Sequence, residues 1–419
     1  MSALRKIAAM SVARGYGMVL SLVTLFVSAR LLGPDGRGEF AAAMAWAALF
    51  ATLCNLSLGQ ALQHRLQSAQ VRPTLAEQLG TLAGLGALLS AAALALAGGL
   101  YLASAGSVFK GLSPLLMGIA LAAVPLLVWE QYASNMLAAA GQTGLLNRAQ
   151  YGGRSVGFGV FFLLVMYLHW GVPGALAAQL VGQCLVAAMV AVPLWRLAGG
   201  SARWARREVA PLLGAGAVIH MTTVSAFLLD QVSILLINHD LGKRDVGFYQ
   251  LAQQMVGLLL IVPQSALMVI YGGLARATPD QFWPQQKRLA LRVLAGVAVL
   301  CAVAYLLAPY MISLVAGQAF DPSAAMFRAL LPSVLGISMA LLMTPQWIGR
   351  GLLKLNTGLT IATGVVVVGA SYWAIPRYGV EGAINVRLAV YAGWIPLVQL
   401  VFWLWCNRRA HARLNEGVE

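Results

Sequence analysis

Long apolar stretches follow one another along almost the whole chain, and only short polar breaks separate them. Reading them between the breaks gives twelve spans, at 10–32, 40–63, 77–103, 112–139, 145–169, 173–196, 210–237, 247–275, 289–316, 324–348, 356–376 and 382–406. A helix needs roughly 20 apolar residues to cross a hydrocarbon core of about 30 Å. The pattern therefore predicts an all-α polytopic membrane protein with about twelve transmembrane helices and no large soluble domain.

Short motifs recur at half the chain length. LLGPDGRGEF at 31–40 and DLGKRDVGFY at 240–249 share the pattern L-G-x4-G-x-[FY], displaced by 209 residues. GVPGA at 171–175 returns as GVEGA at 379–383 after 208 residues, and Pro125 and Pro332 are 207 residues apart. This agreement predicts two six-helix lobes in a parallel internal repeat, because an even number of helices returns the chain to its starting side. We place the lobes at 1–200 and 211–419, joined by a basic cytoplasmic linker at 201–210.

Composition and charge support a membrane location. The chain is 60% hydrophobic and only 10% charged, whereas soluble domains are about a quarter charged. If the chain starts in the cytoplasm, 20 of its 28 basic residues fall on the cytoplasmic side, which predicts an inner-membrane protein with both termini inside. The net charge of +15 does not indicate nucleic-acid binding, because no basic cluster is interleaved with aromatic residues in a polar segment.

Two features of the chain are interpreted as structural. Cys54, Cys184, Cys301 and Cys406 are isolated in apolar runs without metal-ligand spacing, so we expect packing residues and no metal. The apolar stretch 18–29 ends in Val-Ser-Ala, which could pass for a signal cleavage site. We expect an uncleaved first helix instead, because this stretch belongs to the repeated unit.

Four ionisable residues lie deep within predicted spans, where a charge costs at least about 2.5–3.5 kcal/mol on insertion scales. Glu130 and Arg154 are about equally far from the hairpin at 141–144, and we expect them to pair, either as a fixed clamp or as a switch in transport. His220 and Asp230 lie on one helix with a height difference of about 15 Å. Together with Glu130 they are our candidates for ion coupling; the pattern favours packing for His220 and function for Asp230.

The repeated motifs resemble those of a known family. ARLLGPDGRGEF at 29–40, LGKRDVGFY at 241–249 and the two glycine turns are similar to the polysaccharide-unit flippases of the MOP superfamily, the Wzx-type O-antigen translocases and their relatives. The resemblance spans the whole chain. It implies a MATE-like fold with a V-shaped cavity that opens alternately to each side of the membrane.

The resemblance also implies a cargo and partners. The expected cargo is an undecaprenyl-pyrophosphate-linked oligosaccharide, flipped to the periplasmic leaflet for O-antigen, exopolysaccharide or capsule biosynthesis. Expected partners are this polyprenyl pyrophosphate lipid, membrane lipids, a polysaccharide polymerase and a chain-length regulator. Related lipid II flippases carry arginines on helices 2 and 8, but 40–63 and 248–271 contain neither Arg nor Lys, so a peptidoglycan precursor is not expected.

Candidate substrate-binding residues follow from this cargo. Arg14, in the first turns of the first span, suits a pyrophosphate because guanidinium makes bidentate charged contacts, although it could simply mark the cytoplasmic end. Further candidates, either for substrate or for contacts between helices, are Arg154, Arg387, Gln60, Gln253 and Gln254. We expect no cofactor, and the coupling ion would be H⁺ or Na⁺.

Two other functions fit part of the pattern. A cation-coupled drug or metabolite exporter of the same superfamily would share the fold and use Asp230 as its ion site. A membrane-embedded glycan polymerase or ligase would need catalytic residues on a sizeable outward loop. The outward loop at 104–113 carries only Lys110, so we expect a transporter rather than an enzyme.

Overall fold

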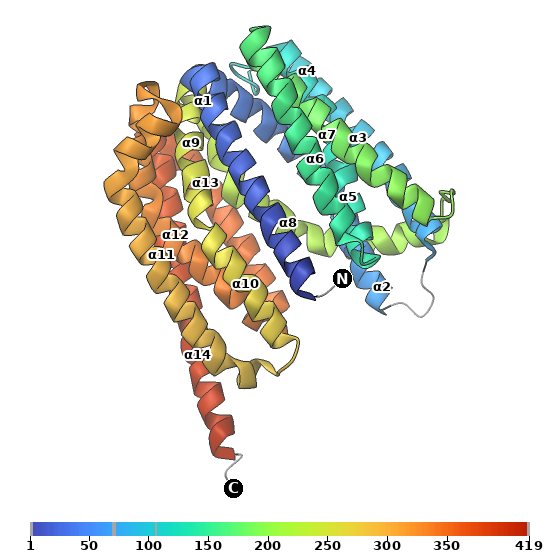
Figure 1. The fold of residues 1–419 in the computed structure, drawn as a ribbon, viewed down its shortest axis with the longest axis vertical. Helices are drawn as coiled ribbons and strands as arrows, with labels where there is room; N and C mark the ends of the chain where they lie inside the picture. The colour runs from blue at the N-terminus through green and yellow to red at the C-terminus, as the bar shows by residue number, and fades with distance from the viewer. Residues whose placement is uncertain (1–2, 69–72, 105–106, 417–419) are drawn as a thin grey trace. The chain divides into compact units, whose positions relative to one another are not determined.

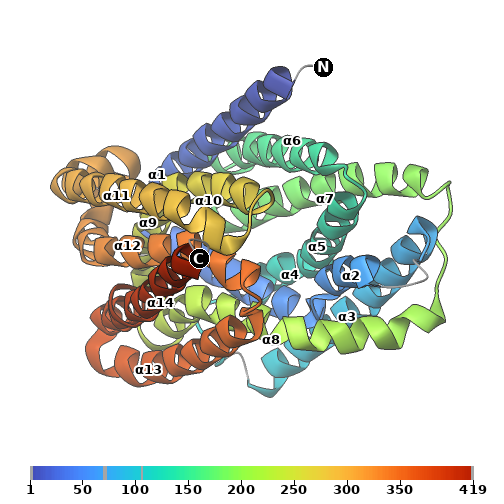
Figure 2. The ribbon, with the colours of Figure 1, turned by 90° about the horizontal axis from the view of Figure 1, so that it is seen from below.

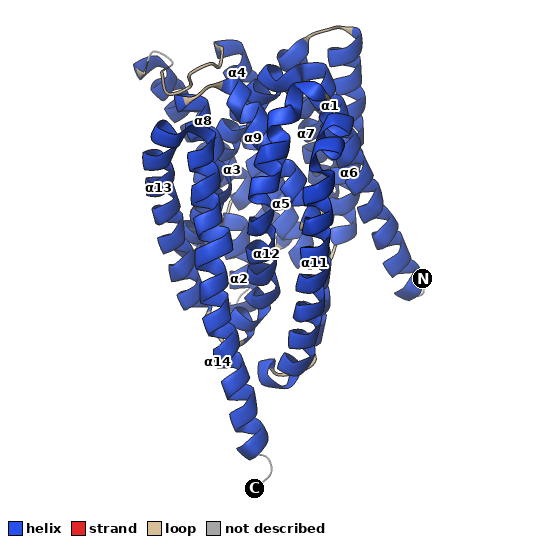
Figure 3. Cartoon of the chain, turned by 90° about the vertical axis from the view of Figure 1, so that its left-hand side faces the viewer, coloured by secondary structure: helices blue, strands red, loops and turns tan. Residues whose placement is uncertain are grey.

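The structure, a computed structural model, describes residues 3–68, 73–104 and 107–416. Throughout this part the chain is helical and contains no strand, as Figure 3 shows. The elements are α1 (Ala3–Asn55), α2 (Leu58–Ser68), α3 (Leu75–Ala103), α4 (Pro114–Ala122), α5 (Val124–Ala139), α6 (Thr143–Phe161), η1 (Phe162–Tyr167), α7 (Gly171–Leu197), α8 (Arg206–Asp240), α9 (Lys243–Leu259), α10 (Ile261–Leu274), α11 (Pro279–Ala316), η2 (Gln318–Phe320), α12 (Asp321–Gly349), α13 (Leu353–Leu388), η3 (Ala389–Trp394) and α14 (Ile395–Glu416).

The membrane-spanning stretches agree with the polytopic character that the sequence predicts. The described residues contain eight helical stretches long and apolar enough to cross a membrane, or nine with the bent pair α9 and α10. Two stretches, Leu22–Leu66 and Leu353–Arg409, have 45 and 57 residues and are each long enough for two crossings. The prediction of an all-α polytopic membrane protein is confirmed.

The repeated glycine motifs form the turns that divide the long helices. Gly33 interrupts α1 with φ of 65° and ψ of -178°, where two helices meet at a kink. Gly242, its partner in the repeat, has φ of 116°, and Gly171 and Gly379 have φ of 55° and 61°. Only glycine adopts these left-handed conformations without a steric penalty, so both motif pairs recur for the same backbone reason.

Two compact units make up the chain. The first comprises Met1–Phe227 and Gly242–Gly247, and the second comprises Leu228–Leu241 and Phe248–Glu419. The division therefore falls inside helix α8. The boundaries read from the repeat, 1–200 and 211–419, stay a prediction.

Helices α6 and α7 of the first unit pack very closely, side by side in Figures 1 and 2. A Cβ atom added at Gly153 would lie 2.7 Å from the Gly182 carbonyl oxygen, and one added at Gly182 would lie 2.8 Å from the Gly153 oxygen. Small residues at such contacts let membrane helices approach to backbone distance. The GGRSVG segment at 152–157 is therefore a helix-packing surface.

The core of the second unit is rich in aromatic residues from α11, α12 and α14. The rings of Trp347 and Phe402 stack at 3.7 Å, and those of Trp283 and Trp403 meet edge to face at 4.9 Å. Such pairs contribute about 0.5–1.5 kcal/mol beyond their burial. They hold the three helices together where α11 begins and α12 ends.

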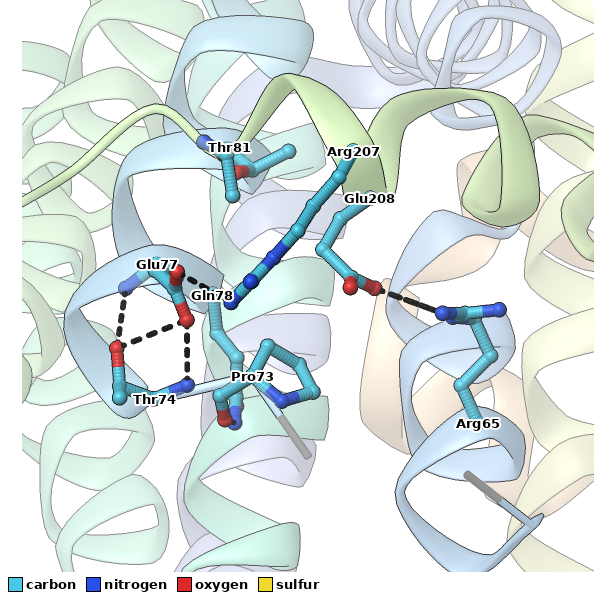
Figure 4. A network of polar contacts seen from close by, with 9 residues as sticks. Arg65, Pro73, Thr74, Glu77, Gln78, Thr81, Arg207 and Glu208 are labelled. Carbon is cyan, nitrogen blue, oxygen red and sulfur yellow. Dashed lines mark hydrogen bonds and ion pairs between the residues drawn. The ribbon is translucent and has the colours of Figure 1, made fainter. Parts of the chain in front are cut away.

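The linker before α8 lies against helix α3 of the same unit (Figure 4). The Arg203 amide donates to the Ala76 carbonyl at 2.9 Å, and the Ala205 amide donates to Thr81 Oγ1 at 3.0 Å. Gly80 and Gly84 make room for it, since a Cβ at Gly84 would lie 2.4 Å from the Trp204 ring. The linker is thus bound along α3 by backbone hydrogen bonds.

Two ion pairs add to this attachment, as Figure 4 shows. Glu208 at the start of α8 accepts from Arg65 on α2 at 2.9 Å, and both side chains are largely buried. Arg207 donates to Glu77 at 2.8 Å, and Glu77 also closes a capping box with Thr74 at the N-terminus of α3. The first turn of α8 is therefore tied to α2 and α3.

Candidate functional site

A buried arginine and a more exposed aspartate form an ion pair in the second unit. Arg387, near the end of α13, places Nη1 3.6 Å from Oδ1 of Asp230 on α8. The Arg387 side chain is only 7% exposed, whereas that of Asp230 is 57% exposed. The Arg387 guanidinium is thus buried in the protein interior, whereas the Asp230 carboxylate that faces it is exposed at the surface of the unit.

The surroundings of Arg387 leave hydrogen-bonding capacity unused. Its guanidinium lies 5.1 Å from the centre of the Tyr391 ring, and the Tyr249 hydroxyl lies near it without hydrogen-bond geometry. Both Arg387 Nε and Tyr249 Oη are buried without a hydrogen-bond partner among the described residues. Buried polar groups normally have partners, so these two atoms indicate a place where a ligand would complete the hydrogen bonding.

The backbone around Arg387 is also unusual. The π-helical segment η3 follows directly, and π-helical turns occur frequently at functional sites. Gly336 on α12 lies so close that an added Cβ would be 1.5 Å from the Tyr391 carbonyl oxygen. The close approach of α12 therefore fixes the segment that carries Arg387 and Tyr391.

Gln253 on α9 belongs to the same cluster. Gln253 Nε2 donates to the backbone carbonyl of Asp230 at 2.9 Å, and its Oε1 is buried without a partner. Gln254 is exposed. Of the predicted substrate-binding residues, the structure brings together Arg387 and Gln253, and it adds Asp230, which we had assigned to ion coupling.

Glu130 has different partners from those we expected. On α5 it accepts hydrogen bonds from Gln150 Nε2 on α6, at 2.9 Å, and from Gln183 Nε2 on α7. Arg154 is exposed and forms no ion pair with it. The expected Glu130–Arg154 pair is therefore wrong. Equal distance from a hairpin fixes the depth of two residues but not the direction in which they point around their helices.

His220 contacts an interruption of the second span. Helix α1 ends at Asn55, and Leu56 and Ser57 have positive φ values of 48° and 51° before α2 begins. Ser57 Oγ donates to Thr223 Oγ1 at 2.9 Å and lies 3.5 Å from His220 Nδ1. Non-glycine residues in this conformation store strain and cluster at functional sites.

His220 and Asp230 belong to separate clusters. The side-chain contacts of His220 are with Ser57 in the first unit, whereas those of Asp230 are with Arg387 and Gln253 in the second. The spacing on one helix therefore did not indicate their partners. Within the described residues, no three His, Cys, Asp or Glu side chains gather as a metal site would require.

The other candidates have less defined surroundings. Arg14 lies on helix α1, but its side chain is outside the described residues. Gln60 is half-buried on α2. Sequence reasoning missed Gln150, Gln183, Tyr249 and Tyr391. Gln150 and Gln183 could have been found from the sequence, because each is an amide side chain close to glycines within a predicted membrane helix.

Solved structures that resemble this chain are membrane transporters. The chain is similar to lipid II flippase MurJ in an inward closed conformation, with TM-score 0.71 and 12% identity over 96% of this chain and 87% of that one. It is similar to an inward-facing multidrug resistance MATE family transporter of the MOP superfamily, with TM-score 0.64 and 16% identity over 93% and 94%. The D35N mutant of the Vibrio cholerae MATE transporter VcmN gives TM-score 0.56 and 14% identity over 97% of each chain. The fold is that of the MOP-superfamily transporters.

The sequence itself identifies the family. A family model described as polysaccharide biosynthesis protein matches residues 3–276, well over half of the chain. No curated protein matches significantly. The chain belongs to this polysaccharide biosynthesis protein family, and the resemblance drawn from the glycine motifs is confirmed.

Proposed function

We propose that this protein flips an undecaprenyl-pyrophosphate-linked oligosaccharide from the cytoplasmic to the periplasmic leaflet of the bacterial inner membrane by alternating access. The observation that carries this proposal is the buried guanidinium of Arg387, whose Nε lacks a partner and whose counter-ion is the exposed Asp230. Membership of the polysaccharide biosynthesis family supports a glycan cargo. In this role, both termini face the cytoplasm, and a polymerase and a chain-length regulator take over the product.

The Arg387 cluster suits a diphosphate. At 3.6 Å, the contact with Asp230 is longer than a charge-assisted hydrogen bond, so the pair is loose. A pyrophosphate presents several oxygens and more negative charge than one carboxylate, and it can occupy two guanidinium donors at once. It would displace Asp230 and take a hydrogen bond from Tyr249. When the substrate leaves, Asp230 compensates the buried cation again.

The sugar moiety would bind uncharged groups. The unpartnered Oε1 of Gln253 can accept from a sugar hydroxyl beside the diphosphate. We propose Gln60 and Gln254 as further sugar contacts, and Arg14 and Arg154 as contacts that guide the diphosphate. Asp230, His220 and Glu130 are the candidates for coupling to H⁺ or Na⁺.

The test is to identify the lipid that accumulates when the gene is deleted. A flippase for this cargo leaves a lipid-linked oligosaccharide on the cytoplasmic leaflet, and the surface polysaccharide disappears. Complementation with Arg387→Gln should fail. Arg377→Gln should succeed, because Arg377 is an exposed residue of the same helix. Protein levels are compared by immunoblot.

Other outcomes would overturn the proposal. A deletion strain with normal surface polysaccharide and changed drug sensitivity would indicate the small-molecule exporter. Glycosyl transfer by the purified protein would indicate a polymerase or ligase. Full complementation by Arg387→Gln would show that transport does not require the Arg387 guanidinium.

A further inference from the structure

Glu130 is a membrane carboxylate that only amides bind. Its two oxygens accept from Gln150 and Gln183, and within the described residues no cation lies within ion-pair distance. The side chain is half-buried, in the middle of helix α5. A bare carboxylate in a hydrocarbon environment is costly and marks functional positions.

The local packing builds this arrangement. Gly153 and Gly182 bring α6 and α7 to backbone contact. Gln150 lies one turn before Gly153, and Gln183 follows Gly182, so the contact sets the two amides next to each other. Helix α5 packs against both helices and is fixed to α7 by a hydrogen bond from Trp129 Nε1 to the Ala187 carbonyl, at 3.2 Å. The carboxylate is thereby held where both amides reach it.

Asp230 and Glu130, the two carboxylates predicted to lie deep in the membrane, differ in whether a positively charged side chain lies beside them. Asp230 faces the Arg387 guanidinium, with Oδ1 3.6 Å from Nη1. Glu130 has two hydrogen-bond donors but, within the described residues, no positively charged side chain at ion-pair distance. An amide can serve both protonation states of a carboxyl group, because its NH₂ donates to the carboxylate and its carbonyl accepts from the acid.

We propose that Glu130 is the proton-coupling site of the transport cycle. This inference rests on the proposed transport function and assigns its driving ion. When Glu130 binds a proton, the new O–H donates to the side-chain carbonyl of Gln150 or Gln183 after that amide rotates. When the proton leaves, the NH₂ group returns. The same pair of amides thus stabilises both states, and no other group changes charge.

A proton fits the site better than a metal cation. The carboxylate accepts from N–H donors on both oxygens, whereas a sodium ion would need several oxygens directed at it. Within the described part of the chain, Glu130 belongs to no group of three or more His, Cys, Asp or Glu side chains that could hold a metal ion.

The titratable groups on neighbouring helices do not take over this role. On α5, Tyr132 is buried and donates to the Asn55 carbonyl. Arg65 on α2 and Glu77 on α3 are paired with Glu208 and Arg207. Within the described residues, three further titratable groups along α6 and α7 form no ion pair with Glu130: Arg148, Arg154 and Cys184.

The direct test is pH-difference infrared spectroscopy of the purified full-length protein in lipid. Protonation of a carboxylate produces a carboxyl C=O stretch, and Glu130→Gln should remove one such band. Gln183→Leu, which removes one donor to the carboxylate, should change the frequency of that band, because it alters the hydrogen bonding of the carboxyl group. Glu381→Gln is the matched control, because Glu381 is exposed and makes no ion pair within the described residues. An unchanged set of bands in Glu130→Gln overturns the proposal.

The functional test uses proteoliposomes with a fluorescent polyprenyl-diphosphate sugar and an imposed pH gradient. In the wild-type protein, the gradient should accelerate translocation. In Glu130→Gln, the ratio of rates with and without the gradient should fall to about one, while Glu381→Gln keeps the wild-type ratio. A wild-type ratio in Glu130→Gln overturns the proton site. Absence of translocation in the wild-type protein would contradict the proposed function instead, and the infrared titration would still decide on Glu130.

Discussion

At the scale of single residues, the free energy of unfolding should depend on the ion pair between Asp230 and Arg387. Asp230→Asn leaves the buried guanidinium without its counter-ion. The loss for a fully buried pair is about 3–5 kcal/mol. We expect about 2 kcal/mol here, because Asp230 is 57% exposed and solvent screens it. The measurement is thermal unfolding in detergent. The double variant Asp230→Asn with Arg387→Gln should be more stable than Asp230→Asn alone, and additive losses would show that the two residues do not interact.

Tyr132 supports the interrupted second span. Its hydroxyl donates to the Asn55 carbonyl at 2.6 Å, just where the helix breaks, and Tyr132 is fully buried. Tyr132→Phe leaves that carbonyl unpaired, so the free energy of unfolding should fall by about 1–3 kcal/mol. Tyr101→Phe is the control, because the Tyr101 ring stacks on Phe109 and its hydroxyl forms no hydrogen bond with the part of the chain that the structure describes. Equal stability of both variants would show that the carbonyl finds another partner.

The sequence indicated the deep charged residues but not their neighbours. Asp230, Arg387 and Glu130 could be found because a charge within an apolar run is visible in the sequence alone. Their partners come from other helices, and the rotation of each helix about its axis depends on packing throughout the unit. Gln150 and Gln183 meet Glu130 because glycines bring α6 and α7 together, and this contact cannot be read from either helix separately.

At the scale of elements, the glycine motifs were informative because they reflect backbone conformation. Gly33, Gly171, Gly242 and Gly379 all have positive φ, as a conserved turn geometry in both halves of the repeat requires. Helix ends and the π-helical segments could not be predicted, because they depend on tertiary contacts such as that between Gly336 and Tyr391.

This contact gives a prediction for α12. In Gly336→Ala, the new methyl group would overlap the Tyr391 carbonyl, which is backbone and can move only with η3. Overpacking typically costs about 1–3 kcal/mol, and we expect at least the upper end. Gly369→Ala in α13 is the control, since nothing lies within 4 Å of its added Cβ and helical alanine is about 0.5–1 kcal/mol better than glycine. Thermal unfolding should separate the two variants, and similar melting temperatures would mean that η3 yields easily.

At the scale of the whole molecule, the linker between the repeats is part of one compact unit. Its residues lie on α3, and the following helix α8 begins within the first unit and ends in the second. A linker that is only a tether would tolerate changes of charge. The Arg65–Glu208 pair argues otherwise, because Glu208 accepts from both Nε and Nη2 of Arg65 with largely buried side chains.

The last prediction compares the two ion pairs that hold the start of α8. Glu208→Arg places a second cation beside Arg65, so it should lower the free energy of unfolding by about 2 kcal/mol and reduce transport. The double variant Arg65→Glu with Glu208→Arg, which exchanges the two charges, should restore most of the stability and most of the transport. The Arg207–Glu77 pair is the internal control, because Arg207 is 63% exposed and such surface pairs contribute about 0–1 kcal/mol. Double-mutant cycles on both pairs, measured by unfolding in detergent, give the two coupling energies, and complementation reports whether transport is restored. The coupling energy of Arg65–Glu208 should be larger than that of Arg207–Glu77. If it is not, the hydrogen bonds from the linker amides to α3 are sufficient to hold the linker, and the attachment of α8 does not depend on charge.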